Sequence, residues 1–371
     1  MTKKIVLTGT HLTPALALID KLKQEKWQIT YLGRQTSFAG SHQPAIEKQL
    51  LPTKKIKFIS ITSPKLQRHN LPASLFHLFR FPLGLTQSLY HLKKLQPAIV
   101  ISFGGYVAVP VCLAAKFLKI PLIIHEQTLA AGLTSKLTAR LADKIALSWS
   151  VSTKYFPANK TILTGNPLRQ ALLNLKPLVS PSQPPAIYIT GGNQGSQIIN
   201  HTLNQIILKL LQQYTLYHQF GLAQSESDWQ KQQNLRRSLP SDLKKRYFLK
   251  RWFTTQDLAS LLPRTKLVIC RSGINTITEL AYLKKPALLI PLPHTQKHEQ
   301  QLNAQFLNSL GLALILPQSQ LSVDSLLKAI NQALKQLPRQ SSQNFPQDLV
   351  KQATNNLYQA ITQLLSDRQK N

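Results

Sequence analysis

Residues 267–304 read LVICRSGINTITELAYLKKPALLIPLPHTQKHEQQLNA and decide the fold of the second half of the chain. The apolar run 267–270 predicts a buried strand, a short turn containing Gly273 follows, and the pattern of residues 275–283 predicts a helix. Residues 287–290 predict the next strand, and a proline-rich loop then leads to another helix near His298. A strand, a helix and a strand in this order predict a parallel α/β sheet.

The turn between the first strand and its helix has the features of an anion site. Gly273 lets the backbone approach a ligand closely, and the N–H groups at the start of a helix attract phosphate. Glu279, on the second turn of the helix, can accept hydrogen bonds from a sugar diol, as acidic residues do in other nucleotide sites. Thr276 and Glu279 also fit the S/T-x-x-E capping box, which would explain this glutamate without any ligand. The stretch alone leaves both interpretations open.

The composition bounds the class of protein. A chain of 371 residues with 43% hydrophobic residues is long enough for two domains with cores of their own. Cys112 and Cys270 are the only cysteines, and their spacing fits neither a disulfide framework nor a zinc site. The apolar run after Lys4 is too short for a signal peptide, and no run reaches the roughly 18 residues of a membrane-spanning helix. We therefore expect a soluble or peripheral protein of a reducing cytoplasm.

The charge of the chain is strongly positive. The formal net charge is +31, and residues 1–180 hold 24 Lys and Arg against five Asp and Glu. Such a field attracts polyanions, which include nucleic acid, anionic lipid headgroups and diphosphate substrates. The alternative is a lysine-rich composition without functional meaning, because net charge governs association and solubility and not fold. Nucleic acid is the least expected partner, since the sequence shows neither aromatic residues placed for base stacking nor a groove-reading helix.

The rest of the chain repeats the α/β alternation in two blocks. The predicted strands are residues 5–7, 28–32, 57–61, 98–102, 122–125 and 144–147, and then 186–190, 214–219, 247–251, 267–270 and 287–290. We expect an α/β fold of two doubly wound Rossmann-like domains that face a central cleft. Their expected bounds are residues 1–170 for the first domain, 171–185 for a proline-rich linker, 186–346 for the second domain and 347–371 for a closing helix.

Residues 69–95 do not fit a plain α/β core. This segment, HNLPASLFHLFRFPLGLTQSLYHLKKL, holds many large apolar side chains between basic ones. Basic residues beside exposed aromatic rings suit the headgroup boundary of an anionic membrane. An ordinary core helix with its Phe residues inside is the alternative.

Four glycine-bearing turns follow predicted strands, at residues 8–11, 104–106, 191–195 and 271–273. In open α/β sheets ligands bind outside the carboxyl ends of the strands, so we expect these turns to line one crevice. Each turn alone is as typical of a tight connection.

Two further stretches add polar side chains to this crevice. His125, Glu126 and Gln127 stand at the end of another predicted strand, where a buried and satisfied His–Glu pair is the alternative. The loop at 294–304 brings Gln300 and Gln301, whose amides can donate to and accept from sugar hydroxyls.

Taken together, seven motifs occur in the order and approximate spacing of the MurG family, which the chain resembles along essentially its whole length. The motifs are His11-x-x-Pro14-Ala15; Gly104-Gly105-Tyr106-Val107 with Pro110; His125-Glu126-Gln127 with Ala131-Gly132-Leu133-Thr134; Gly165-Asn166-Pro167-x-Arg169; Gly191-Gly192-x-Gln194-Gly195; Arg271-Ser272-Gly273; and Gln300-x-x-Asn303-Ala304.

The resemblance implies the GT-B fold and a glycosyltransferase of peptidoglycan synthesis. The implied reaction is the inverting transfer of N-acetylglucosamine from UDP-N-acetylglucosamine to undecaprenyl-diphospho-N-acetylmuramoyl-pentapeptide, which converts lipid I to lipid II. The family requires no metal or other cofactor. The implied location is the cytoplasmic face of the cell membrane, where a peripheral enzyme would meet an anionic inner-membrane surface.

The resemblance also assigns roles to residues of the donor site. Glu279 should bind the uridine ribose, Phe253 should lie against uracil, and Arg169 and Asn193 should contact the donor. Gln300, with Gln301 beside it, should contact the sugar. The diphosphate should be held by the backbone of Ser272, Gly273, Ile274, Asn275, Thr276, Ile277 and Thr278, and this helix N-terminus, aided by Arg169, would stabilise the departing UDP.

On the acceptor side, His11 and Glu126 are the candidate catalytic residues. His11 is the first candidate for the base because imidazole titrates near neutral pH, and Glu126 is the second. The other residues expected to line the acceptor side of the cleft are Thr8, Gly9, Thr10, Gly104, Gly105, Tyr106, His125, Gln127 and Thr128.

The departures from the family fall mainly on the acceptor side. The family's first loop reads G-G-T-G-G-H, whereas Thr8, Gly9 and Thr10 alone precede His11, so glycines of a diphosphate-binding turn are missing. Thr128 stands where the family has asparagine, and Glu299 stands where it has histidine or glutamine. Two alternatives therefore stay open: a GT-B enzyme that uses a UDP-sugar with another acceptor, and a non-catalytic binder of nucleotide sugars or polyanions.

Overall fold

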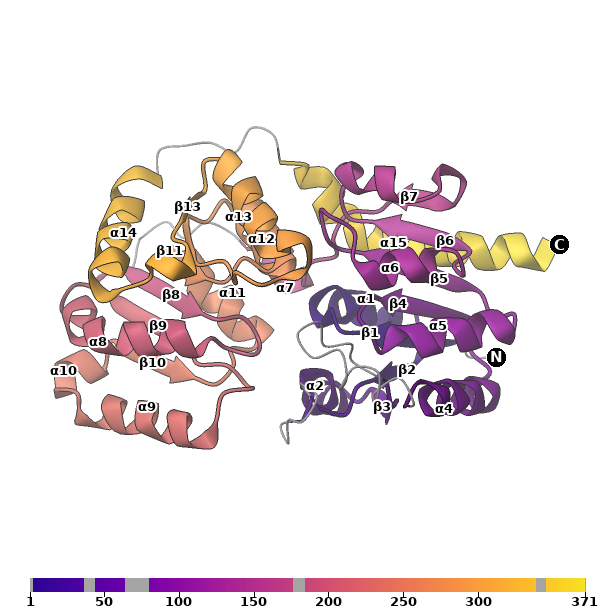
Figure 1. Cartoon of the computed structure of the whole chain (residues 1–371), viewed down its shortest axis with the longest axis horizontal. Helices are drawn as coiled ribbons and strands as arrows, with labels where there is room; N and C mark the ends of the chain where they lie inside the picture. The colour runs from indigo at the N-terminus through magenta and orange to yellow at the C-terminus, as the bar shows by residue number, and fades with distance from the viewer. Residues whose placement is uncertain (1–2, 37–43, 64–79, 176–183, 338–344, 371) are drawn as a thin grey trace. The chain divides into compact units, whose positions relative to one another are not determined.

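The computed structural model describes residues 3–36, 44–63, 80–175, 184–337 and 345–370. The chain divides into two compact units: in Figure 1 the first is coloured from indigo to magenta with its C-terminal helix in yellow, and the second runs from magenta to orange. Unit 1 comprises Met1–Arg169 and Asp348–Asn371, and unit 2 comprises Gln170–Gln347. Each unit holds one fully parallel sheet with helices around it, which confirms the predicted pair of doubly wound α/β domains.

Unit 1 has a seven-stranded sheet in the order β3-β2-β1-β4-β5-β6-β7. Its strands are β1 (Lys4–Gly9), β2 (Gln28–Gly33), β3 (Lys57–Ser60), β4 (Ile99–Phe103), β5 (Leu122–Glu126), β6 (Lys144–Leu147) and β7 (Thr161–Leu163). Its helices are α1 (Leu12–Gln24), α2 (Ile46–Thr53), α4 (Arg80–Leu95), α5 (Ala108–Phe117), α6 (Leu133–Ala139) and α15 (Gln347–Lys370), with 3₁₀ turns η1 (Ser150–Tyr155) and η2 (Ala158–Lys160).

The strand order explains where the helices of unit 1 lie. The connections run outward from β1 toward β3 and outward from β4 toward β7, so the winding reverses between β1 and β4. Right-handed crossovers then place the helices of the two halves on opposite faces of the sheet. On one face α4, α5 and α6 bury Leu92, Val111 and Ala139 against strand residues such as Val100 and Ile124.

Unit 2 has a six-stranded sheet in the order β10-β9-β8-β11-β12-β13. Its strands are β8 (Ala186–Thr190), β9 (Thr215–Gln219), β10 (Tyr247–Lys250), β11 (Thr265–Cys270), β12 (Ala287–Leu289) and β13 (Ala313–Ile315). Its helices are α7 (Gln170–Leu173), α8 (Gln197–Gln213), α9 (Glu226–Ser238), α10 (Ser241–Lys244), α11 (Thr255–Arg264), α12 (Ile274–Tyr282), α13 (Glu299–Ser309) and α14 (Val323–Gln336), with 3₁₀ turns η3 (Gln296–His298) and η4 (Gln318–Gln320).

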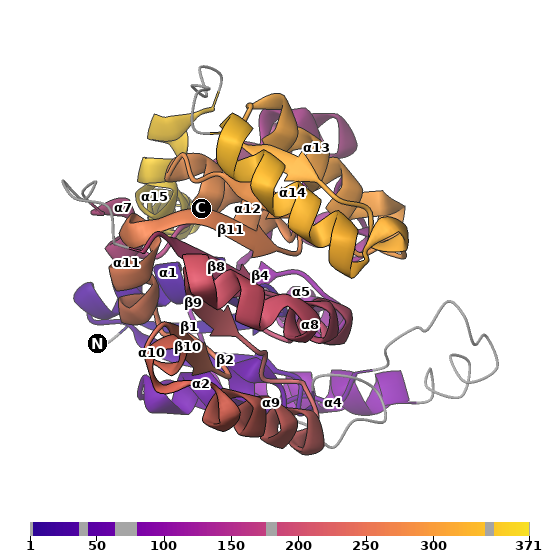
Figure 2. The same cartoon turned by 90° about the vertical axis from the view of Figure 1, so that its left-hand side faces the viewer.

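The core of unit 2 lies between its sheet and two long helices. Helices α8 and α14 lie side by side on one face of the sheet (Figure 2). Leu203 and Leu210 of α8 and Ile330 of α14 pack there against Ile187 and Ile269 of the central strands. Apolar residues recur on one side of each helix. Burying that side against the sheet fixes the rotation of the helix about its own axis.

Two strands and part of the linker differ from the sequence prediction. The edge strands β7 and β13, of three residues each, were not predicted, although β13 lies within the apolar run 312–316. The predicted linker at 171–185 begins within α7, and its residues 176–183 lie outside the described part of the chain. The closing helix predicted at 347–371 is α15, and its contacts group it with unit 1.

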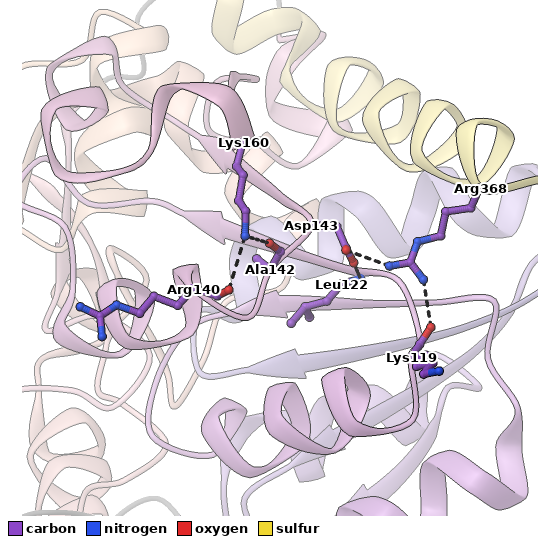
Figure 3. Close-up of polar contacts among 7 residues, drawn as sticks. All are labelled: Lys119, Leu122, Arg140, Ala142, Asp143, Lys160 and Arg368. Atoms are coloured by element: carbon purple, nitrogen blue, oxygen red, sulfur yellow. Dashed lines mark hydrogen bonds and ion pairs between the residues drawn. The ribbon is translucent and has the colours of Figure 1, made fainter. Parts of the chain in front are cut away.

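Polar contacts hold the end of α15 on unit 1 (Figure 3). Arg368 donates to Asp143 Oδ1 at 2.8 Å and to the Lys119 carbonyl at 2.9 Å. Asp143 Oδ2 accepts from the Leu122 N–H at 2.8 Å, so this carboxylate joins the helix to the start of β5. Nearby, Lys160 donates to the carbonyl of Ala142 at 2.9 Å. The C-terminal residues of the chain, which follow unit 2 in the sequence, therefore belong to unit 1.

The segment at 69–95 is described only from residue 80, so residues 69–79 with most of its Phe residues lie outside the described residues. Within α4, Leu92 is buried in the core and Leu85 and Leu89 pack against it, as the core-helix alternative expects. Tyr90 on the same helix is 60% exposed. No helix in the described ranges is both long enough and apolar enough to span a bilayer.

Candidate functional sites in the two units

In each unit the glycine turns gather where the winding of the sheet reverses. In unit 1 this point lies between β1 and β4, which end in the turns around Gly9 and Gly104. In unit 2 it lies between β8 and β11, which end in the turns around Gly192 and Gly273. Such reversal points at the carboxyl ends of the strands are where open α/β sheets bind ligands.

The turn after β11 leaves the start of α12 open. Helix α12 begins at Ile274 after Gly273, which serves as its N-cap and forms no side-chain cap hydrogen bond. A side chain added at Gly273 would meet nothing within 4 Å. The space beside the start of α12 is therefore open, and the N-terminus of a helix with such space suits a phosphate.

The alternative of a capping box at Thr276 and Glu279 is wrong. A capping box requires its threonine at the N-cap, whereas Thr276 is the third residue of α12. The capping box in this part of the chain lies one helix earlier, where Thr254 and Asp257 bond reciprocally at the start of α11. Glu279 lies on the second turn of α12 and is 8% exposed, so its position needs another explanation.

Helix α13 is tied directly to this turn. The Ser272 hydroxyl donates to the Gln300 carbonyl at 2.7 Å, and the Asn303 amide donates to the Ser272 carbonyl at 3.0 Å. The Gln300 side chain accepts from the Leu292 N–H at 2.9 Å, so it is held at the rim of the loop after β12. Gln301, its neighbour, is exposed.

The loop before α13 carries backbone strain. Lys297 and His298 have φ of 51° and 53°, in the left-handed region that non-glycine residues rarely adopt. Backbone strain of this kind persists where surrounding contacts hold it, and it clusters at ligand sites. The N–H of Gln300 donates to Thr295 Oγ1 at 3.2 Å, which is one such contact.

Arg271 is a residue that the site prediction missed. It donates to the Ile290 carbonyl, to Ser196 Oγ and to Gln318 Oε1, at 2.9, 2.8 and 2.6 Å. Burial lowers the pKa of Arg271 to about 10, so the guanidinium stays charged at neutral pH. It therefore joins the β8 turn to the β11 turn and adds fixed positive charge to this end of the sheet.

Asn193 and Phe253, both predicted donor contacts, lie on the β8 and β10 side of unit 2. Asn193 Oδ1 accepts from the Trp252 indole at 3.3 Å, which joins the β8 turn to the segment after β10. Phe253 is 3% exposed, and its ring meets Tyr188 and Tyr217 edge-on at 5.8 and 6.4 Å between centroids. The structure thus brings Phe253 close to the glycine turn, with its ring largely covered by protein.

In unit 1 the turns after β1 and β4 interlock. Gly9 has φ of 129°, and a side chain there would lie 2.7 Å from the Phe103 backbone. The Thr10 N–H donates to the Gly104 carbonyl at 3.0 Å, and the Thr10 side chain fills the space beside Gly105. The predicted acceptor-side glycines are therefore brought together, and each lets the other turn approach.

His11 stands at this junction. It is the N-cap residue of α1, its side chain forms no cap hydrogen bond, and it is half-buried. A side chain added at Gly104 would lie 3.7 Å from His11 Cδ2 and 3.6 Å from Ser135 Oγ, so both side chains lie close to Gly104. Thr8, at the end of β1, is fully buried, and no partner for its Oγ1 is found among the described residues.

Glu126 braces the loop that follows β5. Its Oε1 accepts from the N–H and the hydroxyl of Thr128 at 2.8 and 2.7 Å, and its Oε2 accepts from the Gly132 N–H at 2.9 Å. The side chain is 2% exposed. The alternative to a catalytic role is a buried carboxylate whose hydrogen bonds are satisfied. Glu126 is such a carboxylate, but its donors come from the loop and not from His125.

His125 is fully buried and connects β5 to the segment beneath α15. Its Nε2 lies 3.1 Å from the Gly165 carbonyl and its Nδ1 lies 2.8 Å from the Gln127 amide nitrogen. Because a carbonyl only accepts, Nε2 carries the proton and Nδ1 accepts from Gln127. Burial lowers the pKa of His125 to about 4, so the ring is neutral at physiological pH and suits a bracing role.

Two remaining site residues lie at other places in unit 1. The Tyr106 carbonyl accepts from the Ser63 hydroxyl at 2.9 Å. Tyr106 also lies beside Arg34; burial lowers the pKa of Arg34, but Glu47 and Tyr106 together raise it above its ordinary value. Arg169, a predicted donor contact, is the last residue of unit 1 before the chain enters unit 2.

Models of two protein families match the chain. The glycosyltransferase family 28 N-terminal domain matches residues 6–147, and the glycosyltransferase family 28 C-terminal domain matches residues 186–364. A UDP-N-acetylglucosamine 2-epimerase from Neisseria meningitidis is 14% identical with a TM-score of 0.57, over 98% of this chain and 100% of that chain, which shows the shared fold alone. The fold and the two models define a glycosyltransferase of family 28.

The similarity extends to particular members of that class. The "UDP-N-acetylglucosamine--N-acetylmuramyl-(pentapeptide) pyrophosphoryl-undecaprenol N-acetylglucosamine transferase" of Lachnospira eligens is 34% identical over 339 residues, which is 88% of this chain and 90% of the relative. The crystal structure of Acinetobacter baumannii MurG is 27% identical with a TM-score of 0.61, over 97% of this chain and 99% of that chain. The chain belongs to the MurG family, as its motifs predict.

Proposed function

We propose that this enzyme transfers N-acetylglucosamine from UDP-N-acetylglucosamine to a lipid-linked N-acetylmuramyl-pentapeptide, the acceptor that the names of its relatives state. The observation that carries the proposal is the 34% identity, over 88% of this chain, to a relative with that name. The open start of α12 with Glu279 on its second turn supports it, because this pair suits a diphosphate and a ribose.

The proposed chemistry needs a leaving-group site and a base. The acceptor hydroxyl forms a bond to the anomeric carbon while the bond from that carbon to UDP breaks, with inversion. The N–H groups of α12 and the charge of Arg271 stabilise the departing diphosphate, and no metal is required.

His11 takes the proton of the attacking hydroxyl in this proposal. Its side chain is accessible at the β1 and β4 turns and has no capping bond to give up, whereas three donors already occupy Glu126. Replacing a general base lowers turnover by about 10²- to 10⁴-fold.

The test measures UDP release with a soluble lipid-linked muramoyl-pentapeptide analogue. Glu279→Ala should weaken donor binding, whereas His11→Ala should lower turnover and spare donor binding. Asp242→Asn and His201→Ala, on the exposed faces of α10 and α8, serve as matched controls. Wild-type protein that binds UDP-N-acetylglucosamine but turns over none of the analogues would refute this acceptor.

A different acceptor is the second candidate. The observation that favours it is the first loop of unit 1, where Thr10 fills the space beside Gly105 and the family's further glycines are missing. Product analysis with a panel of hydroxyl acceptors decides between the two, because the donor site is common to both.

We further propose that unit 1 binds the cytoplasmic face of the membrane as a peripheral protein. Helices α4 and α5 pack together, and on their outer surface Tyr90 is 60% and Phe117 78% exposed. Lys93 and Lys94 are exposed on α4, where Lys94 lies 5.8 Å from the Tyr90 ring, and Lys116 is exposed on α5. Aromatic rings amid cations suit the edge of an anionic bilayer.

Vesicle co-sedimentation tests this surface. Binding to vesicles of anionic phospholipid should exceed binding to neutral vesicles and should fall for Phe117→Ser combined with Lys94→Glu. Leu208→Ser removes a similarly exposed apolar side chain from unit 2 and is the control. Equal binding of both variants to anionic vesicles would contradict the assignment.

A further inference from the structure

Gln219 is a buried residue at the end of β9 that the motifs do not single out. Its amide Nε2 donates to Thr190 Oγ1 and to the Gly192 carbonyl, both at 3.0 Å. Its Oε1 accepts from the Phe253 N–H at 3.0 Å and from the Tyr188 hydroxyl at 3.3 Å. A glutamine amide has two N–H donors and two acceptor positions, so every position is used.

The four partners of Gln219 belong to two segments of unit 2, and Gln219 itself lies on a third, β9. Thr190 and Gly192 belong to the end of β8 and its glycine turn, where Gly192 has φ of 81°. Phe253 belongs to the segment after β10. A second tie joins the same two segments, because the Trp252 indole donates to Asn193. Gln219 therefore sets the spacing between the glycine turn and the segment of Phe253.

We propose that Gln219 is a positioning residue for the donor nucleotide, which holds the Gly192–Asn193 turn and Phe253 in their binding arrangement before the nucleotide arrives. The inference rests on the proposed function, because Asn193 and Phe253 are donor contacts only if the donor is a UDP-sugar. Gln219 itself is buried and acts through its partners. Prearranged contacts bind better because ordering them on binding would lower the affinity.

The chemistry of the site admits glutamine and disfavours its nearest substitutes. Glutamate would lose both N–H donors and would set a carboxylate oxygen against the Gly192 carbonyl. Leucine would keep the volume but would leave the Phe253 N–H buried without its partner. Asparagine is one methylene shorter and cannot span the same two segments.

The experiment compares Gln219→Glu and Gln219→Leu with wild type. We expect the KM for UDP-N-acetylglucosamine to rise about 10- to 100-fold, because buried partners of Gln219 are left unpaired. The KM for the acceptor and the kcat at saturating donor should stay near their wild-type values. Gln232→Leu is the matched control, since Gln232 is an equally buried glutamine of unit 2 whose amide donates to Tyr247 instead.

A second variant covers the case in which both Gln219 variants fail to fold. Trp252→Phe removes only the indole tie to Asn193 from a half-exposed side chain and should raise the donor KM by about threefold. If no folded Gln219 variant can be made, an unchanged donor KM in Trp252→Phe overturns the inference.

The outcomes separate this inference from the proposed function. Wild-type protein that fails to bind UDP-N-acetylglucosamine in calorimetry refutes the proposed function itself. Wild-type binding together with an unchanged donor KM in folded Gln219 variants refutes the positioning role alone. An equal rise in donor KM for Gln232→Leu would show general destabilisation of unit 2 and would also refute it.

Discussion

Acid should destabilise unit 1 through His125, and the size of the effect follows from its burial. The ring is neutral in the folded chain, where Nε2 donates to Gly165 and Nδ1 accepts from Gln127. Burial, which outweighs the opposing effects of the Gly165 carbonyl and Glu126, lowers the pKa of His125 from 6.5 to about 4. In the unfolded chain the ring regains its ordinary pKa.

The sign and the magnitude follow from this difference. Below about pH 6.5 the His125 ring is protonated in the unfolded chain but stays neutral in the folded chain. The free energy of unfolding therefore falls as the pH falls toward about 4. One unit of pKa corresponds to about 1.4 kcal/mol, so His125 should remove about 2 to 3 kcal/mol of stability between about pH 7 and pH 4.5. Above about pH 7 its contribution is fully present.

Hydrogen exchange of the β5 amides is the assay, because it reads the stability of unit 1 separately from that of unit 2. His125→Phe should be less stable than wild type at neutral pH, yet its stability should fall by about 2 to 3 kcal/mol less on acidification. His201→Asn, on the surface of unit 2, should leave the β5 profile unchanged. Parallel pH profiles for wild type and His125→Phe would refute the reasoning.

Three further predictions concern stability. Gly165→Ala should destabilise unit 1 by about 3 kcal/mol in chemical unfolding, because φ there is 84° and the added side chain would lie 2.6 Å from the Leu349 carbonyl of α15. Arg368→Ala should remove about 1 kcal/mol, since the pair with Asp143 is partly exposed, and faster hydrogen exchange at the end of α15 would show it. Thr254→Ala should remove about 1 kcal/mol from unit 2 by deleting the cap of α11, with a lower Tm as the readout.

The sequence predicts the sheets well because their strands are buried on both faces. Continuous apolar runs such as residues 267–270 mark such strands without help from the rest of the chain. The edge strands β3 and β10 were also predicted, whereas β7 has three residues and no buried side chain, and β13 lies within the apolar run 312–316, which the prediction passed over. Strand β7 is defined by its pairing with β6, a contact that a local pattern does not show.

The sequence predicts where the candidate sites lie, but it does not predict which side chains bond to one another there. The glycine turns lie at the winding reversals because strand ends and turns are both visible in sequence. The partners of individual side chains were not visible. The S/T-x-x-E pattern at Thr276 matched the motif two residues beyond the true helix start, and Gln219 draws its importance from three segments that meet only in the folded unit.

The choice between His11 and Glu126 as base turns on how much of each side chain is already engaged. Thr128 and Gly132 supply three donors to Glu126, and the residue is 2% exposed, so a substrate hydroxyl would have to reach a buried carboxylate that is already largely engaged. Glu126→Gln would place amide hydrogens against those donors and disturb the loop, and we expect it to raise the acceptor KM as well as to lower kcat. A loss of kcat in that variant would therefore not identify Glu126 as the base. A loss of kcat in His11→Ala at an unchanged donor affinity would support His11, because its ring has no bracing bond to lose at the helix cap.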